Sequence, residues 1–198
     1  MHDDLETYVL LVLSDSNLPT GSFVASAGLE SYVKHGFPPP PISPESTTNF
    51  VRDSLASYAK SAIPFVSDAH RSVEKFALED NEDDDGKPPD ILRILIELDD
   101  LYQAMTLNHV ARRASTAQGV ALLTLYTKAF SCPTSVVSFP AVGTRRHKIQ
   151  MAKLVDEFKL KIRREEVAGH LPICWGILTA ALGLRRGTLS LKLYCLRC

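Results

Sequence analysis

The sequence is poor in cysteine, contains no long apolar run and carries almost no net charge. Its four cysteines are too few and too unevenly spaced for a disulfide framework: Cys132, Cys174, Cys195 and Cys198. No apolar run reaches the roughly 18 residues that a membrane-spanning helix needs, and the N-terminus, with Asp3 and Asp4, lacks the basic region of a secretory signal. A net charge of −1 gives no reason to expect nucleic acid or an anionic membrane as a partner. These absences predict a soluble protein of the reducing cytoplasm.

The sequence also lacks the motifs of common catalytic and metal sites. It contains no Walker phosphate loop, no Gly-x-Gly-x-x-Gly turn after a strand, no His-Glu-x-x-His pair and no Gly-x-Ser-x-Gly turn. Residues 19–22 (Pro-Thr-Gly-Ser) lack the lysine and the preceding strand of a phosphate loop. Cys195 and Cys198 have the spacing of a redox or zinc pair, but no second ligand pair accompanies them, so coincidence is favoured. The sequence therefore predicts no catalytic residue, no metal site and no tightly bound cofactor.

Most of the chain carries apolar residues at helical spacing, whereas only residues 134–139 alternate as a short strand would. Asp4 and Asp90 are predicted N-caps, Pro64 is predicted in the first turn of a helix, and Gly36 and Gly183 are predicted to end helices. Between residues 90 and 129 the pattern fits either one bent helix or two. The amphipathic segments cover residues 5–13, 25–33, 51–62, 65–77, 91–105, 120–126, 149–162 and 171–182. This pattern predicts an all-α fold, one domain of about seven or eight helices over residues 1–198.

Two polar stretches interrupt these helices. Residues 37–48 hold five prolines, which lack the backbone donor that a helix interior needs, and are predicted to be an extended connector. Residues 79–90 form an acidic loop, while residues 145–164 lean basic. A solvated loop and a solvated helix face account for both charge blocks.

Three segments differ from what a helical core requires. In the first, residues 14–30, turn-forming residues precede Gly28. This glycine is predicted inside a helix, where it costs roughly 1 kcal/mol relative to alanine, so it suggests either a close helix crossing or a partner surface. In the second, residues 111–119, two arginines and a glutamine sit beside small residues on an apolar helix. The third, residues 169–183, begins Gly-His-Leu-Pro, and its small residues at positions 176, 180 and 183 predict that this apolar helix approaches a neighbour closely. Each also has a structural explanation: a capped turn, a solvated arginine pair and a tightly packed helix start.

Taken together, in this order and at this spacing, the three segments resemble the urease accessory protein family UreF. The resemblance covers residues 14–23 with 26–30, residues 112–119 with Leu122 and Leu123, and residues 170–172 with 176 and 180–184. It runs from about residue 10 to residue 184. The proline-rich connector and the acidic loop are similar to inserts of eukaryotic, fungal members.

The resemblance implies an all-helical protein, dimeric in its complex, that acts as a chaperone for metal-centre assembly and is not an enzyme. Members of the family bind UreD (also called UreH) and recruit the nickel-carrying GTPase UreG. The assembly acts on apo-urease so that nickel reaches the carbamylated active site, which means that the complex handles the nickel. The candidate partner-binding residues are Ser14, Asp15, Pro19, Gly21, Ser22, Phe23, Gly28, Leu29, Glu30, Arg112, Arg113, Gln118, Gly119, His170, Pro172 and Gly176.

A second interpretation is a regulator that supplies an arginine or a glutamine to a GTPase in trans, because an arginine finger raises the rate by several orders of magnitude. Arg112, Arg113 and Gln118 are its candidates, whereas a helical enzyme has no residue constellation to support it.

The chain departs from the family pattern after residue 184. UreF-like chains continue there with another long helix and a tail that engages UreD. Residues 185–198 instead resemble a frameshifted or misspliced ending. We therefore expect this version to fold poorly or to bind UreD weakly.

Overall fold

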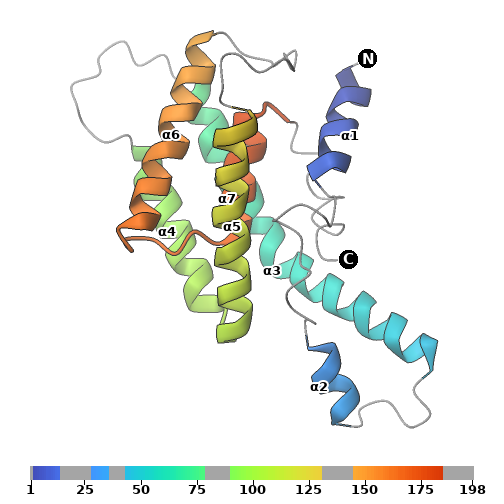
Figure 1. Cartoon of the computed structure of the whole chain (residues 1–198). Helices are drawn as coiled ribbons and strands as arrows, with labels where there is room; N and C mark the ends of the chain where they lie inside the picture. Colours follow the sequence, from blue (N-terminus) through green and yellow to red (C-terminus); the bar gives the residue numbers. More distant parts are fainter. Residues whose placement is uncertain (1, 14–27, 36–42, 79–89, 131–144, 185–198) are drawn as a thin grey trace.

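The computed structural model describes residues 2–13, 28–35, 43–78, 90–130 and 145–184 (Figure 1). Within these ranges the chain forms helices and no strand, which confirms the all-α prediction. The strand predicted at residues 134–139 lies outside the described ranges. The helices are α1 (His2–Leu13), α2 (Leu29–Lys34), α3 (Pro44–Leu78), α4 (Asp90–Met105), α5 (His109–Ala129), α6 (Arg145–Arg163) and α7 (Leu171–Ala181).

Helix α7 is the buried centre of the fold. Every residue from Leu171 to Ala180 is buried, and the helix packs mainly on α3 and α5. An all-round apolar helix of this kind is stable only when neighbours cover each of its faces. The helix ends at Gly183, whose φ of 69° lies in the left-handed region, with the Gly183 and Leu184 N–H groups donating to the Ala180 and Thr179 carbonyls. This is a Schellman motif, and it confirms the end predicted at Gly183.

Gly176 brings α7 into close contact with α3. A Cβ atom at position 176 would lie 2.7 Å from both the Ala69 Cβ and the Val66 carbonyl oxygen, so no larger residue fits without a shift. Nearby, a hydrogen bond of 3.1 Å joins His70 Nδ1 of α3 to Thr179 Oγ1 of α7. Gly176 therefore serves the close approach that the small residues of this segment predicted, and it does so inside the protein.

Helix α3 is one helix of 35 residues, where the sequence predicted a connector, a helix and a second helix beginning at Pro64. The proline at a helix start is instead Pro44, and Ser43 Oγ accepts the Ser46 N–H at 3.1 Å. Residues 44–48 of the predicted connector thus belong to α3. Pro64 is exposed within the helix, because the buried stripe Ala59, Ala62, Phe65, Val66 and Ala69 continues in register across it.

Residues 90–129 form two helices and not one bent helix, because the chain breaks between α4 and α5. Asn108 caps α5: its Oδ1 accepts the N–H groups of Val110 at 2.9 Å and of Ala111 at 3.2 Å. The other predicted N-caps are displaced, since Asp4 lies within α1 and Asp90 is the first residue of α4. None of the helices in the described part of the chain has both the length and the apolar character for crossing a membrane.

The N-terminal helices bury less than the sequence predicted. In α1, Val9 and Leu13 are buried, while Tyr8 and Val12, predicted on the same face, are exposed. Helix α2 has six residues and no buried one, and its Tyr32 ring packs 4.7 Å from that of Phe50 in α3. The helix end predicted at Gly36 lies outside the described ranges.

Candidate functional site

The second and third sequence segments meet at the start of α7. We call this meeting point the α7-start cluster; it consists of Asp99, Gln103, Ser115, Gly119 and His170. Ser115 Oγ of α5 accepts the Leu171 N–H at 3.1 Å. One turn further along α5, a Cβ atom at Gly119 would lie 2.2 Å from the Gly169 carbonyl oxygen, so α5 and the chain before α7 are in direct backbone contact. The two segments, distant in sequence, therefore form one structural unit.

Asp99 of α4 anchors this unit. Its carboxylate accepts three backbone N–H groups, those of Ala168 at 3.0 Å, Gly169 at 2.9 Å and His170 at 2.7 Å. These three residues form the segment that leads into α7; their buried N–H groups need an acceptor, and a carboxylate is a strong one. Asp99 is fully buried, so these bonds are shielded from competing water.

His170 lies beside Asp99 and is also fully buried. Its Nε2 is hydrogen-bonded to Gln103 Oε1, and because an amide oxygen only accepts, Nε2 carries the proton. The ring packs edge-on against Tyr102 at 5.0 Å, while Nδ1 has no hydrogen-bond partner among the described residues. This arrangement fits a neutral imidazole.

The pKa values of this pair are shifted in opposite directions. Burial raises the pKa of the Asp99 carboxyl, and the N–H groups that it accepts oppose this shift. Burial also lowers the pKa of His170, with the Asp99 charge opposing and the Arg112 charge reinforcing that change. Burial thus disfavours the charged form of each group.

The lowered pKa of His170 predicts that acid destabilises the protein. In the unfolded chain a histidine has a pKa of about 6.5. In the folded protein burial lowers the pKa of His170, so the folded state binds this proton more weakly. The stabilising contribution of neutral His170 is therefore complete above about pH 6.5 and is lost as pH falls through the lower folded-state pKa. Urea unfolding at pH 7.5 and pH 5.5 should show a larger drop in unfolding free energy for the wild type than for His170→Gln. His109→Gln, at the exposed start of α5, is the control; equal pH dependence in all three proteins would contradict the assignment.

The candidates of the second segment have different environments. Arg112 is half-buried, and its Nε donates to the Thr106 carbonyl, which ties the first turn of α5 to the α4–α5 connection. Arg113 is exposed, Gln118 is half-buried and Gly119 is buried. Arg113 is thus the member most available to a partner.

The first segment is described only from Gly28 onward. Gly28 was predicted inside a helix at a close crossing, and this is wrong: it precedes α2 with φ of 94°, and the nearest atom to a Cβ there would be Phe50 Cζ at 3.9 Å. Left-handed backbone explains the glycine. Glu30 is exposed and Leu29 half-buried. Six other candidates lie outside the described residues: Ser14, Asp15, Pro19, Gly21, Ser22 and Phe23.

Four candidates are buried: Gly119, His170, Pro172 and Gly176. Their side-chain positions face other parts of the same chain, so in this conformation they shape the core and are not available for direct contact with a partner. Three of them, His170, Pro172 and Gly176, belong to the third segment, and their burial agrees with the tightly packed helix start considered for it.

Sequence reasoning missed Asp99, Gln103 and Ser115. A signal for Asp99 was present, because it shares a helical face with Leu95 and Tyr102, which are both buried. A carboxylate in phase with an apolar stripe is rarely left without hydrogen-bond donors. Its donors could not be inferred, since they lie about seventy positions away along the chain, as in the bond between His170 and Asp99 with a separation of 71.

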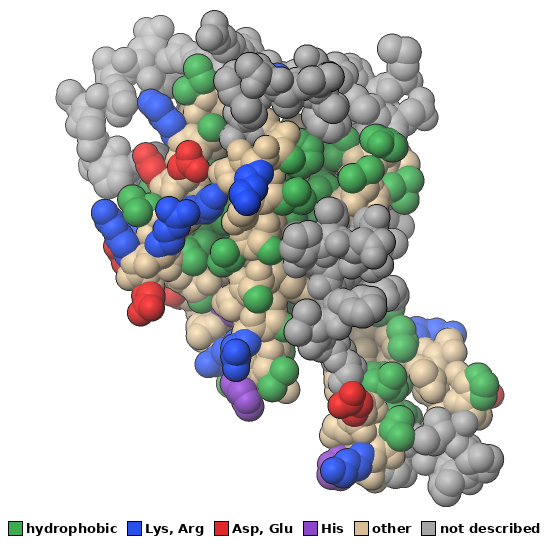
Figure 2. All heavy atoms as spheres, in the orientation of Figure 1, with side chains coloured by type: hydrophobic (Ala, Val, Ile, Leu, Met, Phe, Trp, Pro, Cys, Tyr) green, Lys and Arg blue, Asp and Glu red, His purple; other side chains and the backbone are tan. Residues whose placement is uncertain are grey.

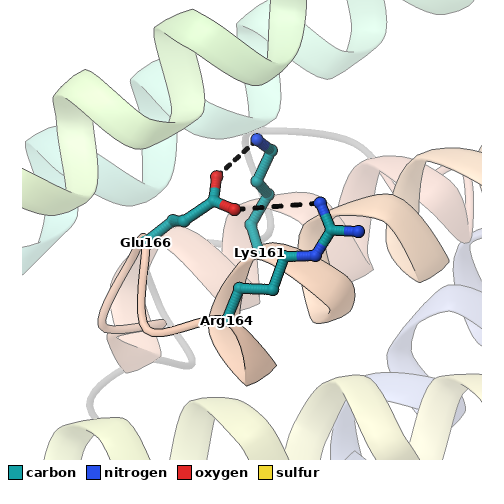
Figure 3. A network of polar contacts seen from close by, with 3 residues as sticks. All are labelled: Lys161, Arg164 and Glu166. Atoms are coloured by element: carbon teal, nitrogen blue, oxygen red, sulfur yellow. Dashed lines mark hydrogen bonds and ion pairs between the residues drawn. The ribbon is translucent and has the colours of Figure 1, made fainter.

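The chain reaches this cluster through a turn at the end of α6 (Figure 3). Glu165 has φ of 59°, and the N–H groups of Glu165 and Glu166 donate to the Ile162 and Lys161 carbonyls. Glu166 also contacts the Lys161 Nζ at 2.5 Å and the Arg164 Nη1 at 3.8 Å, and its pKa is lowered by the Lys161 hydrogen bond. Such exposed ion pairs contribute little stability; the turn geometry directs the chain toward Gly169.

No group of three or more His, Cys, Asp or Glu side chains in the described ranges is placed to hold a metal ion. Cys174 is buried within α7, and burial raises the pKa of its thiol well above the ordinary value. Cys195 and Cys198 lie outside those ranges.

The fold and the α7-start cluster define an all-helical protein whose separated sequence motifs converge on one buried central helix. The UreF family model matches residues 42–194. The chain therefore belongs to the UreF family, as the resemblance of its motifs predicted.

Curated relatives agree with this assignment. Urease accessory protein 6 of Cryptococcus neoformans var. grubii is 35% identical over 90% of this chain and 63% of its own length. A UreF-like urease accessory protein of Schizosaccharomyces pombe is 29% identical over 90% of this chain and 62% of its own length. Urease accessory protein F of rice is 34% identical over 60% of this chain and 38% of its own length. The chain thus spans less than two thirds of the length of these relatives. No solved structure shows significant similarity to it.

Proposed function

We propose that the chain is a subunit of a urease maturation complex. In this role it binds a UreD/UreH-type accessory protein and recruits a UreG-type GTPase, and the assembly delivers nickel to apo-urease. The protein works in the cytoplasm, as a dimer within the complex, and without catalysing a reaction. Membership of the UreF family over residues 42–194 carries this proposal, and the names of the fungal and plant relatives as urease accessory proteins support it.

The position of the motif residues adds a physical reason. The family-like second and third segments meet in the α7-start cluster, which holds the beginning of α7 against α4 and α5. A scaffold needs a rigid core to present its surfaces, because a surface that must be ordered during binding loses affinity to conformational entropy. The cluster would therefore serve the complex by keeping the outer faces of α4 and α5 in place.

Nickel is cargo of the complex in this proposal, and the purified chain should hold no tight nickel site of its own. Tight binding of nickel requires several convergent nitrogen or sulfur ligands. A calorimetric titration of the isolated chain with nickel should show no stoichiometric site of submicromolar affinity. A saturable one-to-one site in that range would contradict the prediction, and a titration after cysteine alkylation would show whether thiols formed it.

A second candidate function is regulation of the GTPase, and the exposure of Arg113 is the observation that favours it. An arginine that enters a GTPase site raises its turnover by a factor of roughly 10³ or more. GTP hydrolysis by the UreG-type partner, measured with wild type and Arg113→Ala, separates the two functions. A scaffold leaves turnover unchanged, whereas a regulator raises it and the variant does not.

The direct test of the proposed function is co-purification of the chain with its UreD-type and UreG-type partners from the same source. A complex containing all three proteins is the expected result. Recovery of the chain alone, under conditions in which the other two proteins are folded, would contradict the proposal.

A further inference from the structure

The sequence is strongly polarised in charge along its length. Between Asp100 and Asp156 there is no acidic residue, although this stretch holds seven lysines and arginines: Arg112, Arg113, Lys128, Arg145, Arg146, Lys148 and Lys153. All of α5 lies within it. A helix of 21 residues without one carboxylate is unusual for an exposed element, since solvent faces ordinarily mix charges of both signs.

Five of the exposed residues of α5 form a single stripe. We call it the α5 face: Val110, Arg113, Ala117, Val120 and Lys128, which follow one another at intervals of three, four, three and eight positions and are all exposed. Such intervals place them on one side of a helix. Val110 is 54% and Val120 39% exposed. Figure 2 shows this side of α5, with basic side chains toward both ends of the helix and no acidic side chain along it.

The apolar character continues past the start of α5. Leu107, in the α4–α5 connection, is 85% exposed, and Met105 at the end of α4 is also exposed. Arg112, whose Nε is bound to the Thr106 carbonyl, fixes this connection against α5. A fixed apolar surface that faces water is typical of a contact site for another protein.

From this stripe we infer that the α5 face binds an amphipathic helix of a partner protein, one with an apolar stripe flanked by carboxylates. The distance from Arg113 to Lys128 along the helix axis is roughly 22 Å, which matches about four turns of a partner helix. The apolar centre favours a helix laid along α5. The cations at either end, with no carboxylate between them, favour an acidic partner through charge complementarity. Two exposed cations are too few to neutralise the phosphates of a nucleic acid.

The inference rests on the proposed function, since it takes the partner from the urease maturation assembly. The test measures binding of the full chain to the UreD-type protein, the UreG-type protein and apo-urease, each purified separately. Val120→Glu and Arg113→Glu place a carboxylate in the stripe without burying it. Each should weaken one of these three interactions by about ten-fold or more, and Arg113→Glu should also reduce the dependence of that interaction on salt.

Matched controls lie on other helices. Leu160→Glu on α6 changes an apolar side chain of 43% exposure, and Lys60→Glu on α3 reverses an exposed charge; both should leave the affinity within about two-fold. Thermal unfolding checks the fold of each variant, and Ala117→Glu, on the same stripe, replaces any variant that unfolds early.

The possible failures are distinguishable. If the wild type binds its partners and the α5-face variants bind them equally well, the inference is wrong and the proposed function stands. If the wild type binds none of the three proteins, the proposed function is wrong and the inference fails with it. Binding of duplex DNA that the same variants abolish would contradict the assignment of a protein helix to this surface.

Discussion

Gly119→Ala is expected to destabilise the protein by about 3 kcal/mol, although alanine favours helices. In the middle of an unhindered helix this change would stabilise by about 1 kcal/mol. Here the new Cβ would lie 2.2 Å from the Gly169 carbonyl oxygen and 3.0 Å from Cys174 Sγ. A backbone oxygen cannot rotate away as a side chain does, so α5 must separate from the start of α7. Overpacking of this kind typically costs 1–3 kcal/mol, and occasionally more.

Urea unfolding of Gly119→Ala measures this loss directly. Ala117→Val serves as the control, because it adds methyl groups to the exposed side of the same helix and should change the unfolding free energy by less than about 1 kcal/mol. A Gly119→Ala protein as stable as the wild type would show that α5 and the chain before α7 are not in backbone contact, and the α7-start cluster would then be wrong.

Asp99→Ala is expected to cost a similar amount, about 3 kcal/mol or more. The substitution removes the acceptor of three backbone N–H groups and leaves those groups without their partner. A buried donor that loses its partner costs about 1–3 kcal/mol. Relief from burying the carboxylate, whose pKa burial raises, offsets part of the total. The cost stays below the sum of three lost bonds for this reason.

The adjacent residue supplies the control for this prediction. Asp100 is exposed to solvent, so Asp100→Ala should change stability by less than about 0.5 kcal/mol. Asp99→Asn should fall between the two, because its amide oxygen still accepts while its NH₂ faces the donors. A small effect of Asp99→Ala, equal to that of Asp100→Ala, would contradict its role as an anchor. Hydrogen exchange at the Ala168–His170 amides would show the loss locally.

Helix content was accessible from the sequence, because apolar periodicity reports the face that each amphipathic helix buries. The stripe through Val155 and Phe158 correctly predicted α6, and both residues are buried. The predictions were wrong where a residue's local preference gave the wrong reason for its position. Pro64 looks like a helix start, but the buried face of α3 continues across it and the helix persists. Gly28 looks like a close-approach residue, while its backbone conformation is the actual constraint.

The candidate site was predictable only in part. Residue types picked out the second and third segments, yet they could not show that the segments meet, since contact between Gly119 and Gly169 depends on how α5 packs against α7. The role of Asp99 could not be predicted for the same reason, because its hydrogen-bond donors lie in the segment that leads into α7. The sequence also could not distinguish Arg112 from Arg113, which are adjacent and carry the same charge. In the structure Arg113 is exposed, whereas Arg112 is half-buried.

Reconstituted activation of urease tests the central claim most directly. Apo-urease, the UreD-type and UreG-type proteins, GTP, bicarbonate and nickel would be combined with and without the chain, and urease activity would be followed over time. If the chain is a urease maturation subunit of the UreF family, activity should rise strongly only when it is present, and Asp99→Ala should give less activation than Asp100→Ala. Equal activation of urease with and without the chain would contradict the account.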